Sequence, residues 1–273
     1  MFAAIGRGQH RQLHAQPWVL DDPFALPFVG PAWPGIYAAL SQAFGEPIIR
    51  EAIGFICGRS RYAEDRLAPG AFTQYVILGA GLDSFAWRRP DLLGSLRVFE
   101  MDHPASQAWK RERIEVLALP ASDRHVFTPV DFETATLRDG LDAVGFDWSQ
   151  LTLYSCLGVF GYLTVDAIEA TLRTVASGAA GSQIVASYAV TQPFLDDNGE
   201  KFRDIIMRLA ADSGEEIKTF LSPTEIEAVF EGCSLQVADH LSRDDLYHRY
   251  FAGRPDALTP YTVERLITAT VPA

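Results

Sequence analysis

The sequence predicts an α/β fold, with helices on both faces of a mostly parallel, seven-stranded sheet. The first observation is a short run of apolar and β-branched residues, Tyr75–Leu78, which is typical of a strand buried on both faces. The second is that further apolar runs follow, separated by segments with helical signals. The third is the last pair of runs, of which the second would be antiparallel. The expected later strands are residues 96–101, 125–130, 151–159, 183–188, 234–239 and 263–271.

The N-terminal segment differs from this pattern. Residues 14–33 are rich in proline and aromatic residues, and prolines at such spacing prevent one long helix. The segment is also too apolar for a disordered tail. We therefore expect an ordered arm, which either folds over the cleft or covers an apolar surface elsewhere. Two helices should follow, over 36–44 and 48–57, because apolar residues recur there at helical spacing.

A glycine pair follows the first expected strand. Gly79-Ala80-Gly81 lets the backbone turn sharply and lets a ligand lie against it. The second expected strand, which would lie beside the first in the sheet, ends at Asp102. Ligands of open parallel sheets bind beyond the carboxyl ends of adjacent strands, so these residues should share a site. Because a carboxylate can accept hydrogen bonds from both ribose hydroxyls, the pattern predicts a nucleoside-binding site.

The residues after the glycine pair indicate which nucleoside is bound. A dinucleotide fingerprint requires a third glycine at position 84, but Ser84 stands there, followed by Phe85 and Trp87. A glycine pair alone suits S-adenosylmethionine, which has no phosphate. An NAD-dependent oxidoreductase is the less favoured alternative, because the chain also lacks a Tyr-x-x-x-Lys pattern.

Later helices carry clear start signals. Pro104 occupies a first turn, where its missing N–H is tolerated. Thr164 is a suitable N-cap for a helix whose Ile168 and Leu172 mark a buried face. Ser222-Pro-Thr-Glu225 is a capping box that should open a helix ending near residue 231.

Five motifs in this order resemble the leucine carboxyl methyltransferase-like family. They are Gly79–Ser84, Val98–Pro104, Gln107–Arg113, Pro129–Phe132 and Leu157–Thr164. The resemblance covers roughly residues 45 to 255. That family includes the phosphatase-subunit carboxyl methyltransferase, many actinobacterial methyltransferases of unassigned substrate, and the tetracenomycin polyketide O-methyltransferase. It implies a Rossmann-like class I methyltransferase fold and S-adenosyl-L-methionine as the cofactor.

The resemblance also implies particular cofactor contacts. In the family an arginine followed by Thr or Ser grips the carboxylate of the methionine moiety; Arg59 matches it, with Arg61 as the competitor. The family places adenine contacts at Asp131 and Phe132, although a helix N-cap is the alternative role for Asp131. Many relatives carry Glu where this chain has Leu157, which offers only apolar contact or its backbone. The expected cofactor-binding set is Arg59, Gly79, Ala80, Gly81, Asp102, Asp131, Phe132, Leu157 and Tyr162.

The acceptor site is expected near a cap. In this fold an insertion after the fifth strand commonly forms a lid, and the apolar stripe of a helix within 193–212 suits a lid or ordinary core packing. We expect Tyr188, Phe202 and Phe24 to contact the acceptor. The domain prediction is one methyltransferase domain over 1–273, with a helical arm and cap over 1–58 and a cap insertion over 190–222.

Composition excludes several classes of function. A net charge of −12 argues against nucleic-acid binding, which needs a basic face. No apolar run reaches the length of a membrane span, and the first 14 residues lack an apolar signal core, so we expect a cytoplasmic protein. Six scattered histidines show no metal-ligand spacing, so no metal site is predicted. A homodimer remains open.

The expected reaction is methyl transfer to an oxygen of a small-molecule or peptide acceptor. A carboxylate is favoured, because the named relatives methylate carboxyl groups and an ionised carboxylate needs no general base. A phenol, with a pKa of about 10, would need one. No residue stands out as that base, so we assign no catalytic residue. The alternatives are phenolic O-methylation of polyketide-type secondary metabolites, and a nucleoside-binding fold that does not methylate or catalyses another reaction.

Overall fold

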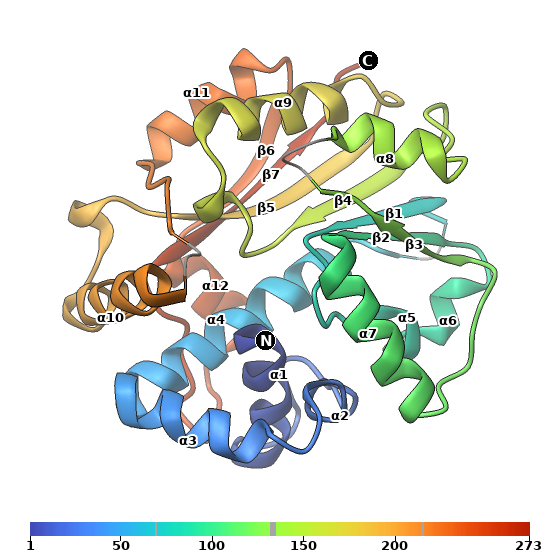
Figure 1. Cartoon of the computed structure of the whole chain (residues 1–273). Helices are drawn as coiled ribbons and strands as arrows, with labels where there is room; N and C mark the ends of the chain where they lie inside the picture. The colour runs from blue at the N-terminus through green and yellow to red at the C-terminus, as the bar shows by residue number, and fades with distance from the viewer. Residues whose placement is uncertain (69, 132–134, 214–215) are drawn as a thin grey trace.

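The computed structural model describes residues 1–68, 70–131, 135–213 and 216–273, and side chains at 211–213 are outside the description. The described residues form a seven-stranded sheet of order β3-β2-β1-β4-β5-β7-β6 (Figure 1). Strands β1 to β5 are parallel, and β7 is antiparallel to both β5 and β6. The fold class and the antiparallel closing strand are as the sequence predicts. The strands are β1 (Gln74–Leu78), β2 (Arg97–Asp102), β3 (His125–Pro129), β4 (Thr152–Cys156), β5 (Gln183–Ala189), β6 (Gln236–Leu241) and β7 (Glu264–Thr270).

Helices cover both faces of this sheet (Figure 1). On one face lie α8 (Leu137–Ala143), α9 (Val165–Ala176) and α11 (Pro223–Gly232). On the other lie α4 (Glu46–Glu64), α5 (Phe85–Arg88), α6 (Pro90–Leu93), α7 (Pro104–Val116) and α12 (Arg243–Tyr250). Alternate side chains of β1 enter different cores: Tyr75 and Ile77 pack with α4, whereas Val76 and Leu78 pack with the helices of the first face. The strand is buried along its whole length, which explains its uninterrupted apolar sequence.

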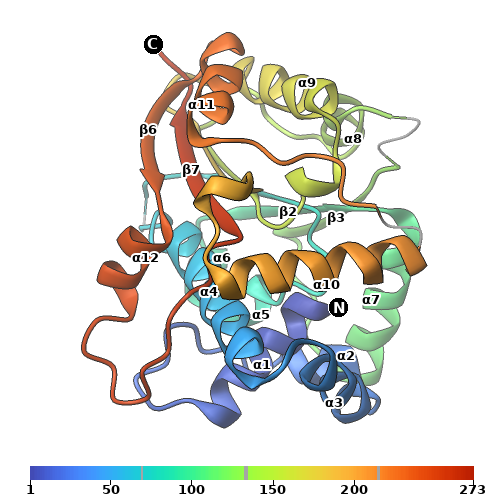
Figure 2. The same cartoon turned by 90° about the vertical axis from the view of Figure 1, so that its left-hand side faces the viewer.

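Four further helices gather beyond one end of the sheet. They are α1 (Phe2–Leu13), α2 (Ala25–Val29), α3 (Trp33–Phe44) and α10 (Asp197–Ser213). Both views place α10 beside the N-terminus (Figures 1 and 2). The ring of Phe202 on α10 lies 6.1 Å from that of Phe2 and stacks on Phe44 at 4.9 Å, measured between centroids. Two regions distant in sequence thus meet through aromatic packing.

The helix over the cleft is α1, not the proline-rich segment that follows it. Phe24 and Phe28 pack behind α1, in an apolar cluster that includes Ile5 and Leu82. Of the two alternatives for residues 14–33, the described contacts fit cover of an apolar surface elsewhere. The arm therefore supports the cleft from behind by fixing α1.

The helix N-caps predicted from the sequence form in the structure. The Thr164 hydroxyl accepts from the Ala167 amide at 3.3 Å, and Ser222 and Glu225 form both bonds of a capping box. Two short 3₁₀ turns, η1 (Phe160–Tyr162) and η2 (Gln192–Phe194), follow β4 and β5. Among the described helices, none combines the length and apolar character needed to cross a membrane.

Candidate active site

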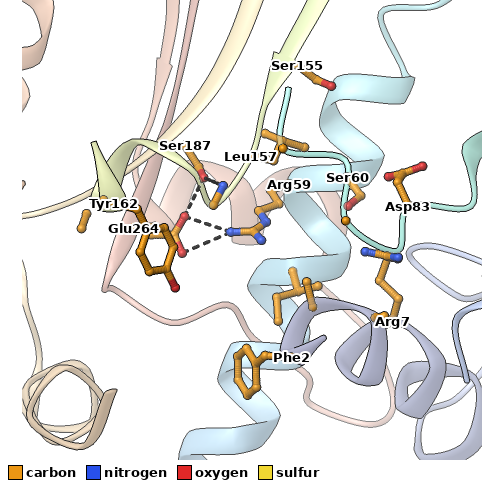
Figure 3. Close-up of a pocket in the computed structure, with 18 of the residues that line it drawn as sticks. Phe2, Arg7, Arg59, Ser60, Asp83, Ser155, Leu157, Tyr162, Ser187 and Glu264 are labelled. Atoms are coloured by element: carbon orange, nitrogen blue, oxygen red, sulfur yellow. Dashed lines mark hydrogen bonds and ion pairs between the residues drawn. The ribbon is translucent and has the colours of Figure 1, made fainter. Parts of the chain in front are cut away.

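A cavity of about 300 Å³ lies at the carboxyl ends of β1 and β4 (Figure 3). Its floor is the turn Gly79–Asp83, and α4 contributes Arg59 from one side. Helix α1 contributes Phe2 and Arg7, while α10 closes the far side. Residues from the whole length of the chain therefore line one enclosed space, as in a site for a small molecule.

The two glycines of the turn serve different purposes. Both have left-handed backbones, with φ of +65° at Gly79 and +49° at Gly81. A Cβ added to Gly79 would lie 2.5 Å from Cγ2 of Val159, so close packing also requires glycine there. A Cβ at Gly81 would meet only the carboxylate of Asp102, at 3.9 Å. The space over Gly81 is thus open, and a ligand can approach the backbone.

Asp102 lies beside this turn at the end of β2. Its carboxylate accepts from the Gly81 amide and, at 2.7 Å, from the His103 amide. Asp131 follows the adjacent strand β3, and the Val130 amide donates to the Asp102 carbonyl at 2.9 Å. The N-cap of α8 is Thr136. Phe132 lies outside the described residues.

Arg59 points into the cavity from α4, and Arg61 does not. Arg59 is buried, and its Nη1 donates to both carboxylate oxygens of Glu264, at 3.2 and 3.0 Å. Arg61 is exposed and pairs with Asp65 at 2.5 Å, one helical turn onward. Because residues two apart on a helix point in nearly opposite directions, only one of these arginines can reach the site.

Glu264 is a central residue that the sequence did not reveal. Besides Arg59, the Ser187 hydroxyl donates to it at 2.6 Å (Figure 3). The Tyr261 hydroxyl donates to it as well. The Gly158 amide in turn donates to Ser187 at 2.7 Å. Burial, reinforced by the Glu264 charge, raises the pKa of Tyr261 well above its ordinary value. Its phenol therefore stays protonated as a donor.

The acceptor residues expected from the sequence divide into those that line the cavity and those that do not. Phe202 lines it, as do Leu157 and Tyr162 of the expected cofactor set. Tyr188 does not: it is buried on the other face of β5, where its hydroxyl bonds to Nε2 of His240 at 2.8 Å. The pleat turns Ser187, its neighbour, toward the cavity instead. Phe24 also lies away from the cavity, because it packs behind α1.

Under the turn lies a second cluster of buried charges. Arg7 bonds to Asp22 at 2.8 Å and to the Leu82 carbonyl at 2.7 Å. Arg88 bonds to Glu64 at 2.6 Å and lies 3.6 Å from Asp22. Burial would raise the pKa of Asp22, but the two arginines hold it below its usual range. These pairs tie α1, α4 and α5 to the turn, and so fix its position.

This arrangement fits S-adenosyl-L-methionine. The open space over Gly81 can take a ligand against the backbone, and Asp102 supplies an acceptor suited to ribose hydroxyls. Arg59 supplies a cation at the opposite end of the cavity floor. Within the described ranges there is no cluster of three or more His, Cys, Asp or Glu side chains that could hold a metal ion.

Comparison with known proteins identifies the family. Residues 1–176 match the sequence model of the leucine carboxyl methyltransferase family. The chain belongs to this family. The protein YktD of Bacillus subtilis strain 168, whose name places it among the S-adenosyl-L-methionine-dependent methyltransferases, is 36% identical over 197 residues, or 72% of this chain. A relative from Mycobacterium sp. strain JLS with the same class name is 29% identical over 82% of the chain.

The chain spans 64% of the Bacillus relative and 75% of the Mycobacterium one. The fold of this family member also agrees with solved structures. A DUF574 family protein from Streptomyces avermitilis MA-4680 superposes with a TM-score of 0.62 at 16% identity, covering 90% of this chain and 94% of that one. A Thermobifida fusca YX protein, named among the methyltransferases, gives 0.63 at 15% identity, covering 90% and 92%. At such identities the likeness shows the fold, and the names of the two relatives give S-adenosyl-L-methionine as the cofactor of those proteins.

Proposed function

We propose that this chain is an S-adenosyl-L-methionine-dependent O-methyltransferase that esterifies a carboxylate of a small-molecule or peptide acceptor. The family supports methyl transfer. The choice of a carboxylate depends on one observation, namely that the described lining of the cavity offers arginines and no histidine, and that two of its three acids are paired with other groups.

The bound cofactor supplies a methyl group on a sulfonium centre. The chain's own task is then to hold two reactants in line and to exclude water. Asp102 and the glycine turn would hold the ribose, and Arg59 the carboxylate of the methionine moiety. Leu157 and Phe202 make the cavity wall apolar, which favours exclusion of water from the reacting atoms.

Two of the three acids that line the cavity are paired with other groups: Glu64 pairs with Arg88, and Glu264 receives three donor groups. Asp83 accepts from the Phe85 amide at 2.7 Å and keeps capacity for a further donor. Burial raises the pKa of Tyr75, so this phenol is also a poor base near neutral pH. The described lining contains no histidine. An acceptor that is already ionised is therefore the best fit to this cavity.

One cation of the cavity also favours an anionic acceptor. Of the three arginines that line the cavity, Arg7 and Arg59 are paired with the acids Asp22 and Glu264, and the third is Arg203, in a chain whose net charge is −12. Arg203 lies on α10, where its bonds are to Gln192 at 2.7 Å and to the exposed Asp204 at 3.3 Å. It also borders an adjacent surface hollow that contains Phe220. We infer that an anionic acceptor enters past α10, where Arg203 offsets repulsion by the acidic surface.

The decisive experiment measures the bond that the methyl group forms. Purified protein would be incubated with methyl-labelled S-adenosyl-L-methionine and a panel of carboxylic acids and phenols. We expect label in a product that strong base hydrolyses to methanol, as it does methyl esters but not aryl methyl ethers. At saturating cofactor the rate should be flat from about pH 6 to 9.

Three results would contradict this proposal. Base-stable label with a rate that rises through that pH range would favour the phenolic alternative. Binding of the cofactor without turnover of any acceptor class would favour a nucleoside-binding fold with another role. Retention of NAD instead of the nucleoside would overturn the cofactor assignment itself.

A further inference from the structure

Arg59 is held from a part of the chain far beyond the residues that match the family. Its partner Glu264 is 205 residues away and opens β7, whereas the family match ends at residue 176. Only Nη1 of the guanidinium takes part in this pair. Nε and Nη2 have no hydrogen-bond partner among the described residues. One fork of the guanidinium is thus left for a ligand, and a fork is the arrangement that binds a carboxylate bidentately.

Glu264 itself has no capacity left for a ligand. Its Oε1 accepts from Arg59 and Tyr261, and its Oε2 accepts from Arg59 and Ser187. An ionised carboxylate offers about four lone-pair sites, and these four bonds use them. A group so fully satisfied acts on its neighbours and not on a ligand.

The same network fixes the other wall against which Arg59 rests. Ser187 receives the Gly158 amide, and Gly158 has a φ of +73°. A Cβ added to Gly158 would lie 2.6 Å from Nη2 of Arg59 and 2.9 Å from Nη1, so the guanidinium lies directly on this backbone. Strands β5 and β7 and the loop after β4 together determine where the guanidinium lies.

We propose that Glu264 is the positioning residue for Arg59, and that it orients the Nε–Nη2 fork toward the carboxylate of the cofactor's methionine moiety. This inference depends on the proposed function, because it assumes that S-adenosyl-L-methionine occupies the cavity. Glu264 holds Nη1 from the side of β7, and Gly158 supports the plane of the guanidinium. Glu264 thereby restricts a flexible side chain to the rotamer that a bound carboxylate requires.

The test is calorimetric binding of two nucleosides to wild type and Glu264→Gln. S-adenosylhomocysteine carries the amino-acid carboxylate, and 5′-methylthioadenosine lacks the whole amino-acid moiety. Glutamine has one carbonyl oxygen, so it can accept from only one of Ser187 and Tyr261, which donate to different oxygens of Glu264. Its NH₂ would replace the other oxygen that Nη1 of Arg59 contacts, and the charged pair is lost. We expect S-adenosylhomocysteine affinity to fall about tenfold and 5′-methylthioadenosine affinity to change less than about twofold.

A double variant and a control complete the design. In Arg59→Met the further change Glu264→Gln should have no additional effect on S-adenosylhomocysteine, because one residue acts through the other. Glu227→Gln is the matched control, since Glu227 pairs with His240 on β6 and does not line the cavity. Equal loss for both nucleosides, or unchanged affinity in Glu264→Gln, overturns the inference. Failure of wild type to bind S-adenosylhomocysteine overturns the proposed function instead.

Discussion

The two halves of the cavity are built in different ways. In the ribose half, the glycine turn lines the cavity and Asp102 lies beside it, 21 residues after Gly81 and on the adjacent parallel strand. In the other half, which would take the methionine end of the cofactor and the acceptor, Arg59 meets Glu264 across 205 residues and Phe2 of α1 meets Phe202 of α10. The first half follows from one strand–helix–strand unit, but the second exists only when distant elements have packed.

The halves also differ in how their charges are used. In the ribose half a single carboxylate faces backbone amides, so it keeps capacity for a ligand's hydroxyls. In the other half the buried charges are paired, as with Arg59 and Glu264. Substitutions should therefore alter affinity in the first half, but both stability and orientation in the second.

The largest expected effect is on the free energy of unfolding, and it should distinguish Arg59 from Arg61, which both lie on α4. Arg59→Met leaves Glu264 without its cation, and breaking a buried pair in this way costs about 3 kcal/mol of unfolding free energy. Arg61→Met removes an exposed pair with Asp65, which contributes less than about 1 kcal/mol. Urea denaturation of both variants measures the difference. Equal stabilities would mean that the Glu264 network contributes nothing to the fold.

Next in size is the loss of cofactor affinity in Asp102→Ala. Removing the carboxylate leaves the ribose hydroxyls without an ionised acceptor and should weaken S-adenosylhomocysteine by about 1.5–3 kcal/mol. Asp91→Ala is the control, because Asp91 is exposed and pairs only with Arg89 at 2.8 Å. The affinity of both folded variants for S-adenosylhomocysteine would be measured by calorimetry. Unchanged affinity in Asp102→Ala would remove this residue from the ribose site.

These two predictions reflect what the sequence could and could not supply. The glycine pair, the acid after β2 and the antiparallel last strand were predictable, because strand order and neighbouring strand ends follow from local patterns. Arg59 was chosen over Arg61 by resemblance alone. In the structure Arg59 lines the cavity and Arg61 is exposed, and the role of Arg59 in binding the cofactor stays a prediction.

The errors have equally specific causes. Tyr188 was placed at the acceptor because it ends a strand, but a shift of one residue along β5 reverses the face, and Ser187 is the residue inside. Phe24 was chosen from composition, which does not say where an arm packs. Glu264 and Tyr261 carry no motif, and only the antiparallel pairing of β5 with β7 brings them to the cavity.

A smaller effect concerns α1, which carries Phe2 and Arg7 to the cavity. His10 on this helix accepts from the Val19 amide at 2.9 Å through Nε2, and therefore must be neutral. Burial, with the nearby His14 and Arg254, lowers its pKa from 6.5 to about 3. Neutral His10 therefore makes its full contribution to the free energy of unfolding above pH 6.5, the ordinary pKa of histidine. This contribution is lost as the pH falls below 6.5.

Between pH 7.5 and 5.5 this linkage removes about 1.4 kcal/mol. The measurement is urea denaturation at both pH values, for wild type and His10→Gln, whose amide oxygen can still accept from Val19. The pH effect should shrink by about 1.4 kcal/mol in the variant. Asp256, whose pKa is lowered to about 2, stays ionised over this range in both proteins, and the comparison reports on His10 together with its neighbour His14. An identical pH effect would show that His10 is not buried as a neutral group.

The smallest expected effect tests whether the two halves are separable. Arg203 is partly exposed and paired with an exposed acid, so its attraction for an anionic acceptor is weakened by solvent. Arg203→Gln should raise KM for the acid identified in the esterification assay about fivefold, near 1 kcal/mol, and leave S-adenosylhomocysteine affinity unchanged. The KM effect should diminish at high salt. Arg173→Gln on α9, which breaks only an exposed pair with Glu169, is the control.

Asp102→Ala changes cofactor affinity alone if the halves are independent, and Arg203→Gln changes acceptor affinity alone. If Arg203→Gln weakens S-adenosylhomocysteine as well, α10 closes over the cofactor, and acceptor binding is not separable from cofactor binding.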